Sequence, residues 1–150
     1  MRRKDREVTG LAELTDILDR CTTLRLGLSR DGSPYIVPVS FGWEVQNGIL
    51  VLYFHSAGAG EKHRLLSQND QVTVEADIFH RYEDLTARYE SFMGRGQVSL
   101  LSGPEKIHAL EQLNLHCGFS DYPVESCGDL SRTAVYRITV TECTGKRSLG

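Results

Sequence analysis

Strand-like segments follow one another along this chain with few helices between them, and this order limits the folds available to it. Two predicted strands lie within LRLGLSRDGSPYIVPVSF, and four more lie within GILVLYF, VTVEADI, Ala87–Leu101 and TAVYRITVTEC. Helical spacing of apolar residues predicts three helices, over Leu11–Cys21, over GAGEKHRLL and after Ser102. A doubly wound parallel sheet needs regular alternation of strand and helix. The order therefore predicts a mainly β fold, a six-stranded antiparallel barrel with flanking helices.

Two of these segments predict more than a strand. The stretch Asp31–Pro34 consists of residues that favour turns, so it is predicted to join a hairpin. GILVLYF is apolar without interruption, which predicts burial on both of its faces. A barrel interior on one face and a second subunit on the other would bury both. We therefore expect a homodimer.

Composition excludes several classes of protein. At 150 residues and 40% hydrophobic, the chain is predicted to form one domain, 1–150, with its own core. A net charge of −3, with no basic run beyond the opening MRRK, gives no nucleic-acid footprint. No apolar run has the length of a membrane span or a signal-peptide core, so we expect a cytoplasmic protein that does not interact with membranes.

The cysteines predict neither disulfides nor a metal site. Cys21, Cys117, Cys127 and Cys143 form no CxxC pair, so reduced thiols are expected. His116 followed by Cys117 and then Cys127 fits no common zinc spacing.

The stretch FHSAGAGEKHRLL combines a run of small residues with a single early lysine, a pattern that favours a loop whose backbone binds an anion. It is not a P-loop, because Gly60 is followed by Glu61, and it is not a dinucleotide fingerprint, because His63 stands at the place of the last glycine. What remains is a strand ending at His55, a small-residue turn and a helix with Lys62 in its first turn. A lysine there is mildly unfavourable unless an anion joins it, since the helix N-terminus is itself positive. The alternative is a solvated surface lysine.

Pro38 interrupts the strand-like stretch from Tyr35 to Phe41. Proline cannot donate to a strand ladder, so this strand is predicted to be open, bulged or at a sheet edge. Such an opening suits a ligand that binds backbone groups. It also suits an edge that is protected against aggregation.

The stretches PYIVPVSFGWE, FHSAGAGEKHRLL and YESFMGRGQV, in that order, resemble the Nim-type 5-nitroimidazole-resistance proteins. These belong to the group similar to pyridoxamine 5'-phosphate oxidase, the FMN-binding split barrels. MRRKDREV, EKIHALEQL and TGKRS extend the resemblance over nearly the whole chain. The resemblance implies a six-stranded split barrel and a homodimer that holds FMN in clefts between its subunits.

The same resemblance implies a set of cofactor-binding residues. The flavin ring would lie against the strand of Val37, Pro38 and Val39, and Lys62 would pair with the FMN phosphate. The other residues expected to approach the flavin are His55, Ser56, Ser91 and Phe92.

An FMN-dependent reductase is the activity that the resemblance implies. A reduced nicotinamide donor would reduce FMN, which would then reduce a small-molecule nitro compound or quinone. His55 is the candidate catalytic residue, since an imidazole can donate a proton near neutral pH, or else it is a structural histidine at a strand end. The alternatives are a flavin-binding storage or sensing module without turnover and a haem-handling barrel, for which the sequence singles out no axial ligand.

Overall fold

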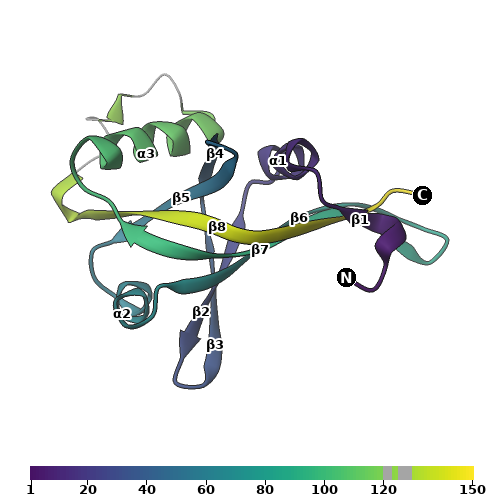
Figure 1. Cartoon of the computed structure of the whole chain (residues 1–150), viewed down its shortest axis with the longest axis horizontal. Coiled ribbons are helices and arrows are strands. Elements are labelled where there is room, and N and C mark those ends of the chain that lie inside the picture. The colour runs from purple at the N-terminus through teal and green to yellow at the C-terminus, as the bar shows by residue number, and fades with distance from the viewer. Residues whose placement is uncertain (120–122, 125–129) are drawn as a thin grey trace.

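A computed structural model describes residues 1–119, 123–124 and 130–150 of the chain (Figure 1). Single helical turns lie at Lys4–Arg6 and Leu130–Arg132. The helices are α1 (Leu11–Asp19), α2 (Glu61–Gln68) and α3 (Gly103–His116). The strands are β1 (Glu7–Val8), β2 (Leu24–Arg30), β3 (Ser33–Val39), β4 (Gly42–Gln46), β5 (Ile49–Ala57), β6 (Gln71–Glu83), β7 (Thr86–Leu100) and β8 (Thr133–Ser148).

One antiparallel sheet contains all the strands, in the order β3-β2-β6-β7-β8-β5-β4, with β1 paired to β8. The edge strands β3 and β4 are joined by only two residues, Ser40 and Phe41. The sheet must therefore roll up until its two edges meet at that connection. Because β3 and β4 are not hydrogen-bonded to each other, the barrel stays split along this line. The predicted mainly β antiparallel fold is confirmed.

The six predicted strands are present, but the prediction missed β4. β4 pairs with β5 across Asn47 and Gly48, which have φ of 52° and 79°. Asn-Gly between two extended segments is a strong hairpin signal that the sequence reading overlooked. The predicted turn was also too long. Only Asp31 and Gly32 have positive φ, whereas Ser33 and Pro34 already belong to β3.

β5 is buried on both faces as predicted, but α3 covers the second face. Leu50, Leu52 and Phe54 point into the barrel core, where α1 also packs. Val51 and Tyr53, on the opposite face, belong to a second cluster with the α3 residues Ala109 and Leu110. The apolar run of β5 is therefore explained within one chain and is no evidence for a dimer.

Gly42 allows α3 to approach the start of β4 very closely. A Cβ at this position would lie 2.7 Å from the backbone nitrogen and Cα of Leu113, which a side-chain rotation cannot relieve. We expect Gly42→Ala to lower the free energy of unfolding by about 1–3 kcal/mol, the usual range for overpacking. Urea denaturation measures this. Gly58→Ala is the matched control, since its Cβ would come no closer than 3.5 Å to another residue. Equal losses for both variants would contradict the close contact as the cause.

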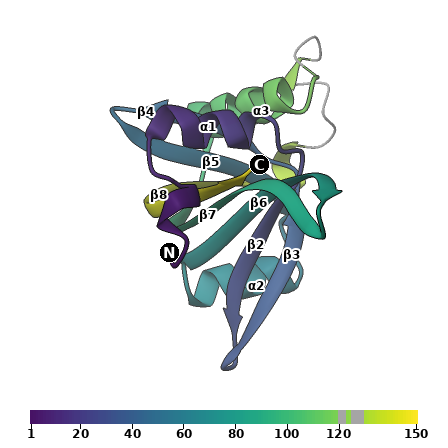
Figure 2. The same ribbon diagram turned by 90° about the vertical axis from the view of Figure 1, so that its right-hand side faces the viewer.

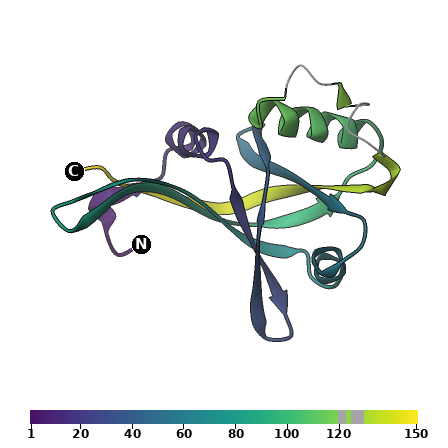
Figure 3. The same ribbon diagram turned by 180° about the vertical axis from the view of Figure 1, so that it is seen from behind.

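The elements are not spread evenly around the sheet. α1 and α3 lie on one side of it and α2 on the other (Figure 2). The β2–β3 hairpin projects on the same side as α2, while the paired ends of β6 and β7 reach out to one end of the molecule as an arm (Figure 3). The arm carries Phe79, Tyr82 and Leu85, all exposed. No helix among the described residues is long and apolar enough to cross a membrane.

A buried carboxylate, Glu90, fastens α1 and β8 to this arm. Its oxygens accept hydrogen bonds from Arg20 at 2.6 and 2.9 Å and from Arg147 at 2.7 Å. His80 Nε2 lies 2.9 Å from it on the neighbouring strand. The Glu90 side chain is only 4% exposed, so its charge depends on these partners.

Candidate functional site

The end of β5 and the start of α2 bring His55 and Lys62 together. Gly60 caps α2 with a φ of 113°, a conformation that favours glycine. No side-chain oxygen caps this end of the helix. Burial and the charge of Lys62 both lower the pKa of His55, which places the two side chains close to each other. A basic pair thus lies beside the positive end of a helix.

Lys62 has no counter-charge within the described chain. It is half-buried, and burial lowers the pKa of its ammonium group. No carboxylate of the described residues pairs with it. Its helix neighbour Arg64, by contrast, is paired with Glu61. An unpaired, partly desolvated ammonium group at an uncapped helix N-terminus is suited to bind a phosphate.

A buried tyrosine on β8, Tyr136, contacts α2 close to the end of β5. The Tyr136 ring stacks on Phe54 at 4.9 Å, and its hydroxyl lies 2.6 Å from His63 Nδ1. Burial raises the pKa of Tyr136, and a hydrogen bond with Ser56 opposes this shift. The Tyr136 hydroxyl therefore joins β8 to His63 of α2, while the Ser56 hydroxyl donates to the carbonyl oxygen of Ala57. The sequence places Tyr136 in the last predicted strand, TAVYRITVTEC, but nothing local indicates a contact between residues 73 positions apart.

Pro38 lies at a sheet edge, as predicted. β3 pairs only with β2, where Arg25 stands opposite Pro38. Val39 is buried and Val37 packs against the barrel core, whereas Pro38 is exposed. The free edge of β3 therefore offers backbone groups to a ligand, while its two valines support the strand from inside.

The two predicted site residues on β7 lie elsewhere. Phe92 is 0% exposed in the barrel core, so its side chain contributes to packing. Ser91 is half-buried and pairs with Lys146 of β8, whereas His55 pairs with Val135 of the same strand. Eleven residues of β8 separate these two positions, roughly 35 Å along a strand. Within one chain, Ser91 and His55 cannot contact the same flavin ring.

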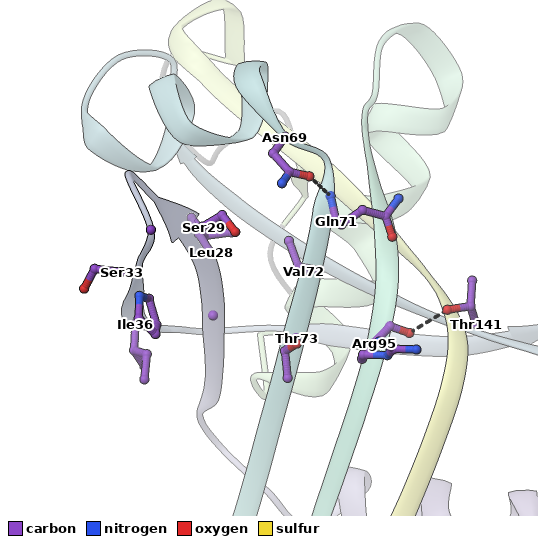
Figure 4. Close-up of a pocket in the computed structure, with 13 residues that line it drawn as sticks. Leu28, Ser29, Ser33, Ile36, Asn69, Gln71, Val72, Thr73, Arg95 and Thr141 are labelled. Atoms are coloured by element: carbon purple, nitrogen blue, oxygen red, sulfur yellow. Dashed lines mark hydrogen bonds between the residues drawn. The ribbon is translucent and has the colours of Figure 1, made fainter.

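A cavity of about 700 Å³ lies on the outer face of the sheet, and none of the predicted site residues lines it (Figure 4). Gly27, Thr73 and Arg95 belong to its floor, and Ile36, at 68% exposed, lies at its side. Arg95 is bound to Glu142 at 2.8 Å, and its carbonyl accepts a hydrogen bond from Thr141. This open face is available to another protein surface.

The described residues contain no group of three or more His, Cys, Asp or Glu side chains that could hold a metal ion. Cys127, one of the residues considered for zinc, lies outside the described residues. Cys117 contacts the carbonyl oxygen of Phe41 instead.

Comparisons with known proteins cover almost the whole chain. A family model described as pyridoxamine 5'-phosphate oxidase matches residues 11–147. No curated protein matches. Among solved structures, a proposed 5-nitroimidazole antibiotic resistance protein from Bacteroides thetaiotaomicron is 27% identical, with a TM-score of 0.82 over 93% of this chain and 85% of that one.

Two more distant structures share the fold. The flavocytochrome Anf3 from Azotobacter vinelandii is 20% identical, with a TM-score of 0.78 over 100% of this chain and 72% of that one. An FAD- and heme-binding protein from Mycobacterium smegmatis is also 20% identical, with a TM-score of 0.79 over 97% and 74%.

Proposed function

The chain belongs to the pyridoxamine 5'-phosphate oxidase family, and from this premise we propose that it is an FMN-dependent oxidoreductase. Its substrates would be nitro compounds or quinones, and its electron donor a reduced nicotinamide. The observation that carries the proposal is the half-buried Lys62 at the uncapped start of α2, to which no described residue supplies a counter-charge. Relatives described as FAD-binding support a flavin cofactor, and the nitroimidazole-resistance neighbour supports the substrate class.

The side chains at the end of β5 fit this role. When bound, FMN would supply the hydride and electron chemistry. Lys62 and the α2 N-terminus would hold its phosphate, and the free edge of β3 would bind the ring through backbone groups. Burial and the charge of Lys62 lower the pKa of His55, so its imidazole is mostly neutral at pH 7, where its N–H can donate a hydrogen bond to a substrate oxygen; a proton is supplied only by the minor protonated form, which grows as the pH falls.

The direct test is the identity of the bound cofactor and its turnover. We expect purified protein to carry a flavin spectrum and to release FMN on denaturation. Steady-state reduction of metronidazole or a quinone with NADH or NADPH would then distinguish an enzyme from a flavin-binding module without turnover. A haem spectrum would overturn the cofactor assignment, and flavin without turnover would favour the storage or sensing module.

Lys62→Glu tests the phosphate site. Charge reversal replaces attraction for the phosphate with repulsion. We therefore expect FMN affinity to fall about 10- to 100-fold, the effect of losing a charge-assisted hydrogen bond. Fluorescence titration of apoprotein with FMN measures this. Arg64→Glu is the matched control, because Arg64 lies on the same helix, is exposed and is paired with Glu61. Full flavin occupancy in Lys62→Glu would remove Lys62 from the site.

We also propose that the protein is a homodimer whose subunits share each flavin. The distance between Ser91 and His55 along β8 supports this, since Ser91 can reach a flavin at His55 only from another copy. The open outer face of the sheet, with Ile36 and Met93 exposed, offers a surface for such contact. Sedimentation at micromolar concentration should show twice the 16.8 kDa chain mass, and a species of the chain mass alone would contradict the dimer.

A further inference from the structure

A second cavity, of about 350 Å³, lies on the side of the sheet opposite the barrel core. The start of α3 forms one wall with Pro104 and His108, and neighbouring strands form the other with Tyr53 and Arg137. Its volume is in the range of small-molecule pockets. None of the residues assigned to the flavin site lines it.

Arg137 is the unusual feature of this cavity. It stands opposite Tyr53 in the ladder between β5 and β8, so its side chain faces α3. Its Nε atom is buried and has no hydrogen-bond partner. Among the described residues, no carboxylate oxygen lies within 4.0 Å of its guanidinium group. Nε itself is closed to the cavity, but Arg137 lines it, and none of the hydrogen bonds or ion pairs among the described residues involves its guanidinium group, whose outer N–H groups can therefore bind an acceptor there.

The neighbouring polar groups already have partners. Glu44 Oε1 accepts hydrogen bonds from Tyr53 at 2.5 Å and from Gln46 at 2.7 Å, and it lies 2.8 Å from His108 Nε2. Burial would raise the pKa of Glu44, but the hydrogen bonds from Tyr53, His108 and Gln46 outweigh it and lower that pKa. This network fixes one wall of the cavity, and it leaves the Arg137 guanidinium as the group that needs an acceptor.

Charge and shape limit what that acceptor can be. The planar guanidinium fork of Arg137 matches a carboxylate, which it can bind through two hydrogen bonds. Glu105 also lines the cavity, and Glu44 contacts His108 in the cavity wall. These two carboxylates would repel a dianion such as phosphate. Leu101, Pro104 and the Tyr53 ring offer apolar surface to the carbon part of a ligand.

We propose that this cavity binds a small organic monocarboxylate, with its carboxylate on Arg137 and its apolar body against Leu101, Pro104 and Tyr53. The site is separate from the proposed flavin site and does not depend on it. The positive end of α3, whose first turn includes Pro104, adds to the attraction for the anion.

Benzoate is the probe, titrated into the purified protein by calorimetry and followed by the NMR signals of Tyr53 and His108. We expect saturable binding to the wild type and about 10- to 100-fold weaker binding to Arg137→Met, the effect of losing a hydrogen bond between charged groups. Arg81→Met is the matched control, because Arg81 lies on the exposed arm, and it should bind benzoate like the wild type. Equal affinity of Arg137→Met and the wild type would overturn the proposal.

Glu105→Gln is a second test, because its expected result is tighter binding of benzoate, which damage to the fold would not produce. Removing this carboxylate lowers the negative charge at the cavity, so benzoate should bind several-fold more tightly than to the wild type. Unchanged thermal unfolding of each variant shows that the cavity is intact. Binding only in Glu105→Gln would mean that Glu105 itself occupies the cavity, and it would overturn the proposal, as would no binding to any variant.

Discussion

His55→Ala is expected to keep its flavin and to pass electrons to metronidazole about 10²–10⁴-fold more slowly than the wild type, the range of general acid catalysis. The cofactor should stay bound because Lys62, the α2 N-terminus and the β3 edge do not depend on the imidazole. Reduction of a nitro group consumes protons as well as electrons, and His55 is the titratable side chain at the end of β5, at the surface but partly desolvated by the atoms packed around it.

The pH dependence follows from the surroundings of His55. Burial and the Lys62 charge lower the pKa of its imidazole, so the protonated form accumulates only below the usual value of 6.5. The wild-type rate should therefore rise as the pH falls from 8 toward that pKa, while His55→Ala should lack this rise.

Stopped-flow oxidation of prereduced protein across pH measures both effects. His55→Gln separates the two roles of the ring, because an amide can donate a hydrogen bond but cannot supply a proton. Equal rates for wild type and His55→Ala would leave His55 a structural residue. Loss of flavin from His55→Ala would instead make it a binding residue.

Glu90→Gln is expected to lower the free energy of unfolding by about 3–5 kcal/mol, the cost of removing one member of a buried ion pair. The neutral amide would remove the buried carboxylate between Arg20 and Arg147 and leave them only the exposed carboxylates of Asp16 and Glu13. Both arginines keep some contact with water, which favours the lower end of this range. Glu142→Gln is the matched control, since Glu142 and Arg95 are 69% and 67% exposed and such pairs contribute at most about 1 kcal/mol.

The difference in free energy of unfolding between wild type and Glu90→Gln should become smaller as the pH falls. Hydrogen bonds from Arg20, opposed by burial and assisted by Arg147 and His80, hold the pKa of Glu90 well below its usual range. The folded state therefore binds this proton less readily than the unfolded chain, whose glutamate pKa is about 4.3. The stabilisation is fully present above that value and is lost as the pH falls toward the folded pKa. Urea denaturation of wild type and Glu90→Gln should give a constant difference from pH 8 to 6 and a shrinking one below about pH 4. A difference that grows in acid would contradict this account.

The sequence predicted the strands well where side chains alternate, because that alternation records which face meets the core. The strict alternation in VTVEADI predicts that Val72, Val74, Ala76 and Ile78 share one face of β6; the first three are buried and Ile78 is partly buried against the same core. Pro38 indicated a sheet edge because proline has no N–H group to donate to a strand ladder. β4 was missed because it is short, although Asn47 and Gly48 indicated its hairpin.

What the sequence left open concerns partners that are distant along the chain. The apolar run of β5 showed that both faces are buried, but it could not show that α3 rather than a second subunit covers Val51 and Tyr53. The contact of Tyr136 with His63 and the buried, unpartnered Nε of Arg137 arise only when β8 is placed beside β5. The roles of His55, Ser56, Lys62 and Ser91 toward a flavin stay predictions.

The place of β8 in the sheet bears on how a chain of this kind is assembled as it is synthesised. β8 lies between β7 and β5, and near its end it also holds β1. During synthesis β5 is complete at residue 57 and β7 at residue 100, well before Thr133 begins the strand that joins them. Until then β5, apolar on both faces, has only β4 beside it. The nascent chain thus presents two unpaired strand edges, which are the surfaces that chaperones and neighbouring chains recognise.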